Sequence, residues 1–301
     1  MKKLFRTFTV AALVISLLAS CQKDEFNGNA ETVDGKKVTE NVVKSFNKKY
    51  PGASNVIWEN KAPYWVAHFD LKKTKAATAN TRTNSTWFDD QGNWQMSEHD
   101  IDYEALPAAI RNAFEASKYA SWKKDDVQTL ERDGVIELYM IEVEQENGKE
   151  EIEMELYYTT DGVLTKEVPS SDDHTNLIPE ELPEKVKADL DRRFEKYELI
   201  EVEKEEDEFE VEVLFNGNDY ELKYDVDLNW VETEYDIELN AVPANVLDVL
   251  KKTVANLEEF EIDDIEVTET KDGLVYEFEL EHKKTDEEIE IRINDKGEIV
   301  K

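Results

Sequence analysis

The chain is poor in the residues from which disulfides and compact catalytic centres are built. It has one cysteine and four histidines among its 301 residues, so no disulfide can form within it. The histidines, His68, His99, His174 and His282, lie far apart, and none belongs to a HExxH motif. The sequence also lacks a GxSxG motif and a phosphate-binding loop. We therefore predict a protein that is not an enzyme, needs no cofactor and is held together by packing alone.

Positive charge is scarce as well. The chain has 36 basic and 71 acidic residues, and removing the basic residues of the leader described below leaves 33 against 71, a net charge of −38. The excess is uneven, because residues 177–301 hold 15 basic and 41 acidic residues. Such a surface repels nucleic acid, which is bound through lysine and arginine at its phosphates. The second half is thus expected to be a soluble spacer or to attract a cationic partner.

No apolar run is long enough to cross a bilayer, which takes about 20 residues, and Val10–Leu18 is the apolar core of the leader. Basic residues come before it and Leu18-Ala19-Ser20-Cys21 ends it, so residues 1–20 are predicted to be a signal peptide. Leu-Ala-Ser-Cys resembles the lipobox of bacterial lipoproteins. The resemblance implies cleavage before Cys21, lipid attachment to this residue, and a lipidated tether over residues 21–36 that holds the protein to the membrane.

The residues after Cys21 bear on which side of the membrane the protein occupies. Gln22, Lys23, Asp24 and Glu25 resemble the acidic signal that sends some Gram-negative lipoproteins to the outer face of the outer membrane. The same polar stretch is also typical of a plain solvated tether. We expect a surface-exposed outer-membrane lipoprotein, with a periplasm-facing lipoprotein as the alternative.

Four apolar series with helical spacing divide the rest of the chain. One series runs Leu182, Val186, Leu190, Phe194 and Tyr197, with steps of four, four, four and three residues, which line one face of a helix. Similar series begin at Leu106 and Val242 with a proline next in the chain, and another begins at Val38. Runs that alternate apolar and polar residues follow each series, and these runs indicate antiparallel strands packed on one side.

The sequence thus predicts an α+β fold of four tandem repeats, each one helix plus a four-stranded antiparallel meander. The stretch from Ser170 to Asn176 is the most linker-like between repeats. We therefore expect two domains of two repeats each, over residues 37–169 and 177–301.

Acidic or glycine turns before the last strand recur at residues 89–94, 160–163 and 294–297, while residues 225–230 have no glycine. This order resembles the PepSY-like family, which is also described as similar to the β-lactamase inhibitor protein. The resemblance covers residues 37–301 and implies a non-catalytic binding module in which paired repeats form a continuous curved sheet. Inhibition of an enzyme is not carried over with it.

Two candidate sites follow from the residues. Tyr64 and His68 would share one face of a strand, where later repeats carry glutamate, and Lys72 and Lys73 lie in the neighbouring loop. Aromatic residues supply large contact area at interfaces, so these four residues are a candidate site for a protein partner. The alternatives are core packing for the rings and an ordinary hairpin loop for the lysines.

The second candidate is calcium. Asp225-Val226-Asp227-Leu228-Asn229 has the alternating oxygen ligands that begin a calcium loop but lacks its glycine and bidentate glutamate. A turn stabilised by Asp and Asn side chains is the other interpretation. The leading hypothesis is a lipid-anchored extracytoplasmic binding protein. The alternative is a calcium-stabilised structural or adhesive surface protein, and an enzyme with converging carboxylates in a deep pocket comes third.

Overall fold

The computed structural model describes residues 32–33, 36–71, 82–147, 150–171, 173–204, 207–285 and 287–300. In these ranges the chain forms four α-helices, two eight-stranded antiparallel sheets and a two-stranded sheet, which confirms the predicted α+β class. The predicted signal peptide lies outside the described residues. So do the lipid-attachment and export residues and the two loop lysines: Cys21, Gln22, Lys23, Asp24, Glu25, Lys72 and Lys73.

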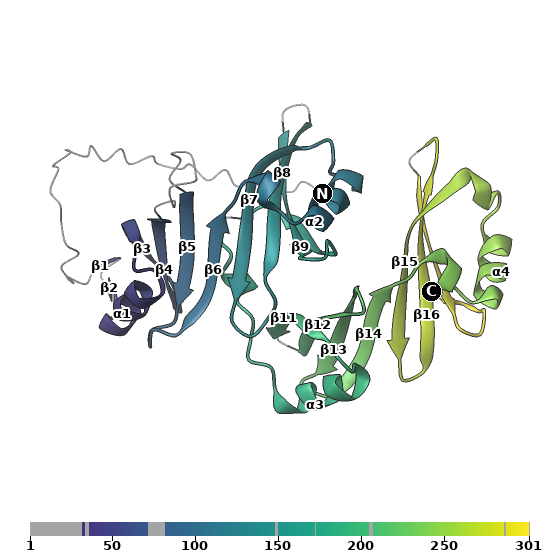
Figure 1. The fold of residues 1–301 in the computed structure, drawn as a ribbon. Coiled ribbons are helices and arrows are strands. Elements are labelled where there is room, and N and C mark those ends of the chain that lie inside the picture. The colour runs from purple at the N-terminus through teal and green to yellow at the C-terminus, as the bar shows by residue number, and fades with distance from the viewer. Residues whose placement is uncertain are drawn as a thin grey trace, which may run out of the picture.

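The first large sheet is a meander in which each strand pairs with the next along the chain, and it is the purple-to-teal sheet of Figure 1. Helix α1 (Glu40–Lys49) precedes it, and α2 (Ala108–Ala116) lies between its fourth and fifth strands. A 3-10 helix, Tyr103–Ala105, leads into α2. The strands are β3 (Ala53–Lys61), β4 (Tyr64–Leu71), β5 (Arg82–Phe88), β6 (Trp94–Asp100), β7 (Lys123–Arg132), β8 (Leu138–Asn147), β9 (Glu150–Thr159) and β10 (Leu164–Pro169).

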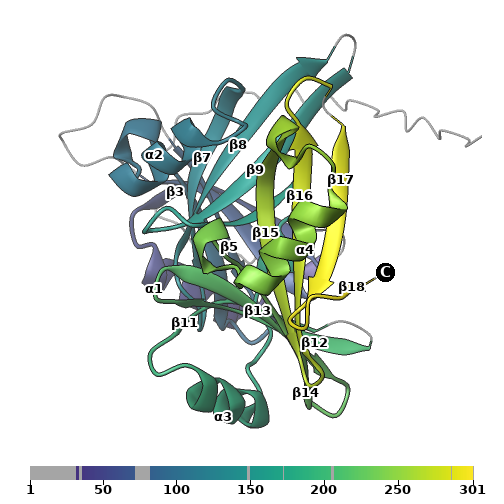
Figure 2. The same ribbon diagram turned by 90° about the vertical axis from the view of Figure 1, so that its right-hand side faces the viewer.

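The second large sheet has the same element order, with α3 (Glu184–Arg193) before it and α4 (Ala244–Thr253) between its fourth and fifth strands. Its strands are β11 (Glu198–Lys204), β12 (Glu208–Phe215), β13 (Asn218–Asp225), β14 (Trp230–Asp236), β15 (Phe260–Thr270), β16 (Gly273–His282), β17 (Glu288–Asn294) and β18 (Ile299–Val300). Figure 2 shows α4 lying across the strands of this sheet. The remaining elements are β1 (Thr32–Val33), β2 (Lys36–Lys37) and 3-10 helices at Thr175–Leu177, Leu239–Ala241 and Leu257–Glu259.

The helices are shorter than their apolar series predict. Helix α3 ends at Arg193, although the series continues to Tyr197. Phe194 leaves the helix with a φ of −122°, yet its ring and that of Tyr197 still pack into the cluster beneath α3. The last members of the series therefore reach the core from extended chain, a geometry that apolar spacing alone cannot distinguish from one more helical turn.

One hairpin turn recurs after the third strand that follows each helix. In the turn at residues 89–93, Asp89 N–H donates to Asn93 O and Gly92 N–H donates to Asp89 O, both at 3.0 Å. The same two backbone bonds recur at residues 159–163, 225–229 and 294–298. Gly92 has a φ of +86°, and a Cβ there would lie 2.7 Å from the carbonyl carbon of Asn41 in α1. In the third turn, Leu228 takes the glycine position with a φ of +58°.

Each helix and the strands that follow it enclose their own apolar cluster. Phe46 of α1 packs with Trp58 and Phe69, and Leu190 of α3 packs with Val211 and other strand residues. Clusters of the same kind lie under α2 and α4. All four helices thus cover one face of their own sheet, and the opposite face of each sheet is where the two halves of the chain differ.

Candidate partner-binding surfaces

Strand β4 places Tyr64 and His68 on the face of the first sheet that is free of helices, as the alternation predicts, while Trp65 joins the core under α1. The His68 ring nitrogens lie 3.0 Å from Ser85 Oγ and 3.2 Å from Glu59 Oε2, and its side chain is about one-third exposed. The Tyr64 ring packs partly buried against the cluster described next. The His68 side chain is thus accessible to solvent, whereas the Tyr64 ring is partly buried. The role of both residues in binding a partner remains a prediction.

An apolar cluster on that face joins the two halves of the chain, and we call it the junction cluster. The second half contributes Leu177 from the 3-10 helix after the predicted linker, Ile200 from β11 and Leu214 from β12. Where it carries this cluster, the helix-free face of the first sheet is therefore buried together with residues of the second half, whereas His68 on the same face is about one-third exposed. Its members from the first sheet are Val66, Trp87, Met96, Leu130, Leu138, Met140 and Tyr157.

A buried arginine stands at the edge of the junction cluster. The Arg132 side chain has no exposed surface, and its Nη2 donates to Ile200 O at 2.6 Å while Nη1 donates to Leu177 O at 3.4 Å. Lys166 Nζ lies 3.1 Å from both carboxylate oxygens of Glu201 and 3.1 Å from Glu203 Oε1. These contacts bind β7 and β10 of the first sheet to β11 of the second.

Backbone bonds cover the outer edge of β11. Leu199 O accepts from Ile136 N–H and Val202 O accepts from Glu180 N–H, both at 2.8 Å. An uncovered edge strand offers such groups to another chain, so these bonds remove a site for strand addition.

His174 ties the predicted linker to the first sheet. Its Nδ1 lies 2.5 Å from Glu98 Oε1 on β6, and its Nε2 lies 3.2 Å from Glu155 Oε1 on β9. Burial alone would lower the pKa of this imidazole, but the hydrogen bonds and negative charges of Glu155 and Glu98 outweigh burial and raise the pKa to about 10. His174 is therefore an imidazolium at neutral pH, and the segment that looks linker-like in sequence is fixed.

The helix-free face of the second sheet has the opposite composition, and we call it the acidic face. On β12, Val211 and Val213 point towards α3 while Glu210 and Glu212 lie on the other side. The register extends this pattern across the sheet and sets like charges directly opposite each other, as in Glu212 with Glu221 and Asp236 with Glu266. Its carboxylates include Glu210, Glu212, Asp219, Glu221, Glu234, Asp236, Glu266, Glu277, Glu279 and Glu290.

The acidic face is hollowed beside the junction, and this acidic hollow has a volume of about 370 Å³. Glu212 lines it, and its Oε1 is inaccessible to solvent and has no hydrogen-bond partner. A second hollow of about 820 Å³ shares Tyr235 and Asp236 with the first and adds the rings of Tyr220 and Phe260. The two hollows therefore adjoin each other at Tyr235 and Asp236.

The carboxyls of the acidic hollow resist ionisation. Burial raises the pKa of Glu212 to about 9, helped by the charges of Asp219 and Glu201. Burial raises the pKa of Glu266 to about 7 and that of Asp236 to about 6, with neighbouring carboxylates adding to both shifts. Like-charged carboxylates close together disfavour one another's ionised forms, so the face is electrostatically strained at neutral pH.

The carboxylate of Asp225 accepts hydrogen bonds from within its own turn. Asp225 Oδ1 accepts from the N–H groups of Asp227 and Asn229 at 3.0 and 2.8 Å, and Lys185 Nζ donates to Asp227 O at 2.7 Å. These hydrogen bonds lower the pKa of Asp225. They are the Asx-turn contacts of the second interpretation given above, and calcium binding here remains a prediction.

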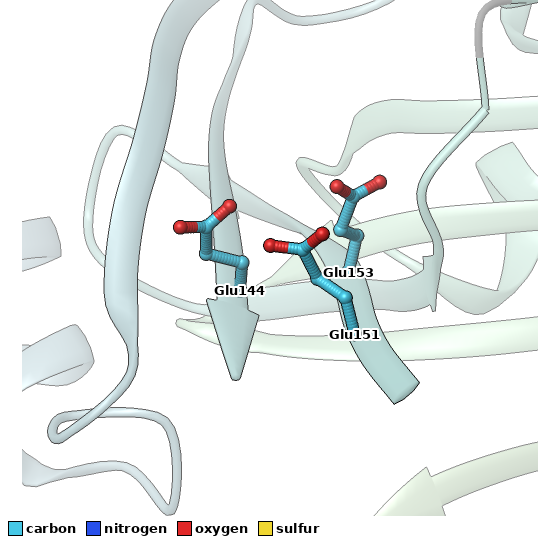
Figure 3. A group of neighbouring side chains, drawn as sticks. All are labelled: Glu144, Glu151 and Glu153. Carbon is cyan, nitrogen blue, oxygen red and sulfur yellow. The ribbon is translucent and has the colours of Figure 1, made fainter. Parts of the chain in front are cut away.

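The carboxylates of three glutamates lie close together near the end of β8 and the start of β9, as Figure 3 shows. The carboxylate oxygens of Glu144, Glu151 and Glu153 lie within 4.8 Å of one another. Lys123 Nζ already forms an ion pair with Glu144, and both other glutamates are exposed. A solvated strand pair gives the same arrangement, so we assign no metal site here.

Two features of these surfaces could be predicted from the sequence, and one could not. The charge imbalance and the Glu–apolar alternation of residues 208–213 both point to the acidic face. The run Trp65-Val66-Ala67, with no polar residue between its apolar ones, indicates a strand buried on both faces. The partners of His174 lie 76 and 19 residues away, and local patterns cannot identify them.

None of the described helices has the length and apolar character needed to cross a membrane. No curated protein matches the chain.

The family model described as "Putative beta-lactamase-inhibitor-like, PepSY-like" matches residues 72–166, 171–228 and 210–301. These segments cover most of the chain, so the protein belongs to this PepSY-like family, as the turn and repeat pattern predicted.

Solved structures similar to the chain come from Bacteroides, and each corresponds to about half of it. A DUF2874 family protein from Bacteroides ovatus is 31% identical, covers 48% of this chain and 95% of its own, and gives a TM-score of 0.40. A BLIP-like protein from Bacteroides fragilis is 30% identical, covers 45% of this chain and 91% of its own, and gives a TM-score of 0.37. A protein from Bacteroides eggerthii described as periplasmic is 22% identical, covers 47% and 95%, and gives a TM-score of 0.40.

Proposed function

We propose that the protein is a lipid-anchored, extracytoplasmic binding protein without catalytic activity, which binds or inhibits a protein partner. The lipobox at Cys21 supports the anchor, and residues 22–25 support display on the outer face of the outer membrane. Membership of a β-lactamase-inhibitor-like family supports binding rather than catalysis. The relative named BLIP-like belongs to the same kind of protein.

The binding part would be four copies of one unit, paired over residues 37–169 and 177–301. Each of the four α-helices precedes four strands in the chain, and each unit has the same turn against the start of its helix. The second residue of each helix meets this turn: Asn41, Ala109, Lys185 and Asn245. A repeated unit accounts for the recurrence of both features.

The single observation that carries the proposal is the contrast between the two helix-free faces. The face of the first sheet carries the apolar junction cluster that it shares with the second half of the chain, whereas that of the second sheet carries carboxylates around a hollow to which, among the described residues, the first half contributes Thr165 and Lys166. A broad sheet face that no helix covers is a surface on which another protein can dock. His68 at the first sheet remains a second candidate contact, and the prediction for Lys72 and Lys73 stands with it.

Photo-crosslinking on intact cells tests the proposal with the native, lipidated protein. A photoreactive residue in place of Glu234 on the acidic face should capture an envelope protein, whereas the same residue in place of Glu184 on α3 should not. The pair Tyr64→Ala/His68→Ala tests the first-sheet contact, and unchanged capture by this variant removes that contact from the proposal. Equal crosslinking from both sides of the sheet would argue against a binding face.

The anchor is tested separately. Cys21→Ser should release the protein from the membrane fraction, and protease added to intact cells should remove the wild-type chain if it points outward. Protection from the protease, with membrane attachment intact, favours the periplasm-facing alternative.

A further inference from the structure

The acidic face already holds ammonium groups of the protein's own lysines. Lys223 Nζ lies 2.6 Å from Glu234 Oε2 and 3.2 Å from Glu221 Oε1. Lys166, which lines the acidic hollow, is held by Glu201 and Glu203. At both sites two or three carboxylates converge on one nitrogen, from β11 around Lys166 and from β13 and β14 around Lys223.

Three carboxylates of the acidic hollow have no such cation. Among the described residues, no lysine, arginine or histidine forms an ion pair with Glu212, Asp236 or Glu266, although all three line the acidic hollow. Like charges directly opposite in a sheet are destabilising, so the chain tolerates repulsion here that a neutral face would avoid. Local arrangements that reduce stability without a structural gain are expected where a protein binds something.

Size and shape favour a polypeptide over a small cation. Opposed carboxylates continue past the acidic hollow to Glu279 and Glu290 on β16 and β17, beyond the reach of a single ion. The adjoining hollow is also lined by Tyr220 and Phe260, but their rings pack against the apolar clusters under α3 and α4. A strip of carboxylates suits lysine or arginine side chains spaced along a chain, because successive cations can pair with successive carboxylates.

We propose that the acidic face is the docking surface for a lysine- or arginine-rich segment of a partner protein, with one basic side chain in the acidic hollow among Glu212, Asp236 and Glu266. This inference rests on the proposed binding function and adds the chemistry of the partner. The inserted ammonium or guanidinium group supplies the missing counter-charge, and the segment continues along the opposed carboxylates towards Glu279 and Glu290. Binding is therefore expected to weaken steeply as salt is added.

Titration calorimetry with the full lipidated chain in detergent tests the inference, with decalysine as the probe. Wild-type protein should bind decalysine, and Glu212→Gln/Glu266→Gln should weaken this affinity by about tenfold or more. The matched control is Glu184→Gln/Asp248→Asn, which removes the same charge from exposed positions on α3 and α4 and should change the affinity by less than about twofold. Equal weakening by both variants would mean attraction to net charge only and would overturn the assignment of the site.

Spermine and calcium serve as the competing ligands. If either displaces decalysine at a similar concentration, the face is a general cation site and the polypeptide assignment is wrong. Failure of this inference is distinguishable from failure of the proposed function: a partner that crosslinks at position 234 but is not displaced by decalysine would retain the binding function and reject its basic chemistry. Circular dichroism of both variants checks that they are folded.

Discussion

The two sheets share one architecture but use their helix-free faces in opposite ways. In the first sheet this face carries Val66, Trp87 and Met96, all essentially buried by the second half of the chain. In the second sheet it carries carboxylates that line a hollow. Apolar surface is stabilised by being covered, and charged surface is destabilised by being covered unless it is paired. The same fold can thus serve as a support on one side of the junction and as a binding surface on the other.

The largest expected effect comes from the arginine that holds the covered face. Arg132→Met should lower the free energy of unfolding by about 3–5 kcal/mol, because it leaves the carbonyls of Leu177 and Ile200 and the nearby Glu201 without their buried donor. Urea unfolding measures the effect. Arg292→Met is the control on the open face, since Arg292 is about half exposed and its pairing with Glu277 should contribute less than about 1 kcal/mol. Equal effects would show that the junction is not specially dependent on its buried cation.

The next effect is the loss of the cation between Glu98 and Glu155. His174→Gln should lower stability by about 2–3 kcal/mol at pH 6, because it leaves two buried carboxylates without their charged partner. The folded-state pKa of about 10 lies above the usual 6.5, so the stabilisation by His174 is complete below pH 6.5 and disappears as the pH rises through 10.

Thermal unfolding between pH 6 and pH 10 tests this pH dependence. The wild type and His174→Gln should converge at the alkaline end, and His282→Gln, which replaces a histidine on β16 away from the junction, is the control. A difference between wild type and His174→Gln that stays constant with pH would show that His174 does not stabilise the junction as an imidazolium.

The sequence predicts the residues on one face of each sheet better than those on the other. The residues of the helix-covered face can be predicted from local periodicity, because the spacing of Leu190 and Val211 indicates that they are buried. The other face depends on what the rest of the chain brings to it, and no local pattern shows that Ile200 and Leu214 join the cluster that contains Val66. The sequence shows the negative charge of the acidic face. Its hollow, however, results from the register of β12 with β13 and of β14 with β15.

The recurrent turn gives a moderate effect with a close control. Gly92→Ala and Gly134→Ala both place alanine at a φ above +80°, which costs about 1–2 kcal/mol. Only the Cβ at position 92 would meet neighbouring backbone, at 2.7 Å, whereas nothing lies within 4 Å of position 134. We expect Gly92→Ala to cost about 1–3 kcal/mol more, measured by urea unfolding. Equal costs would show that the turn does not pack tightly on α1.

The smallest expected effect is a gain in stability on the open face. Glu212→Gln keeps the shape of the side chain and removes a charge whose folded-state pKa, about 9, lies well above the usual 4.5. The wild type keeps its full stability below pH 4.5, where Glu212 is neutral, and loses stability as the pH rises through 9. Wild type and variant should therefore be equally stable at pH 4.5. At pH 9 the variant should be more stable than the wild type, with the difference growing as the pH rises from 4.5 to 9.

The groups that face Glu212 decide the size of this gain. Asp219 and Glu221 on β13 and Glu201 on β11 repel its charge, while Lys166 on β10 attracts it. Glu208→Gln, at an exposed position on the same strand, is the control and should change stability by less than about 0.5 kcal/mol at either pH. If Glu212→Gln gains nothing at pH 9, the acidic face is not strained in the unbound protein. If it gains stability while losing affinity for decalysine, the repulsion that weakens the fold is the same repulsion that a basic partner relieves.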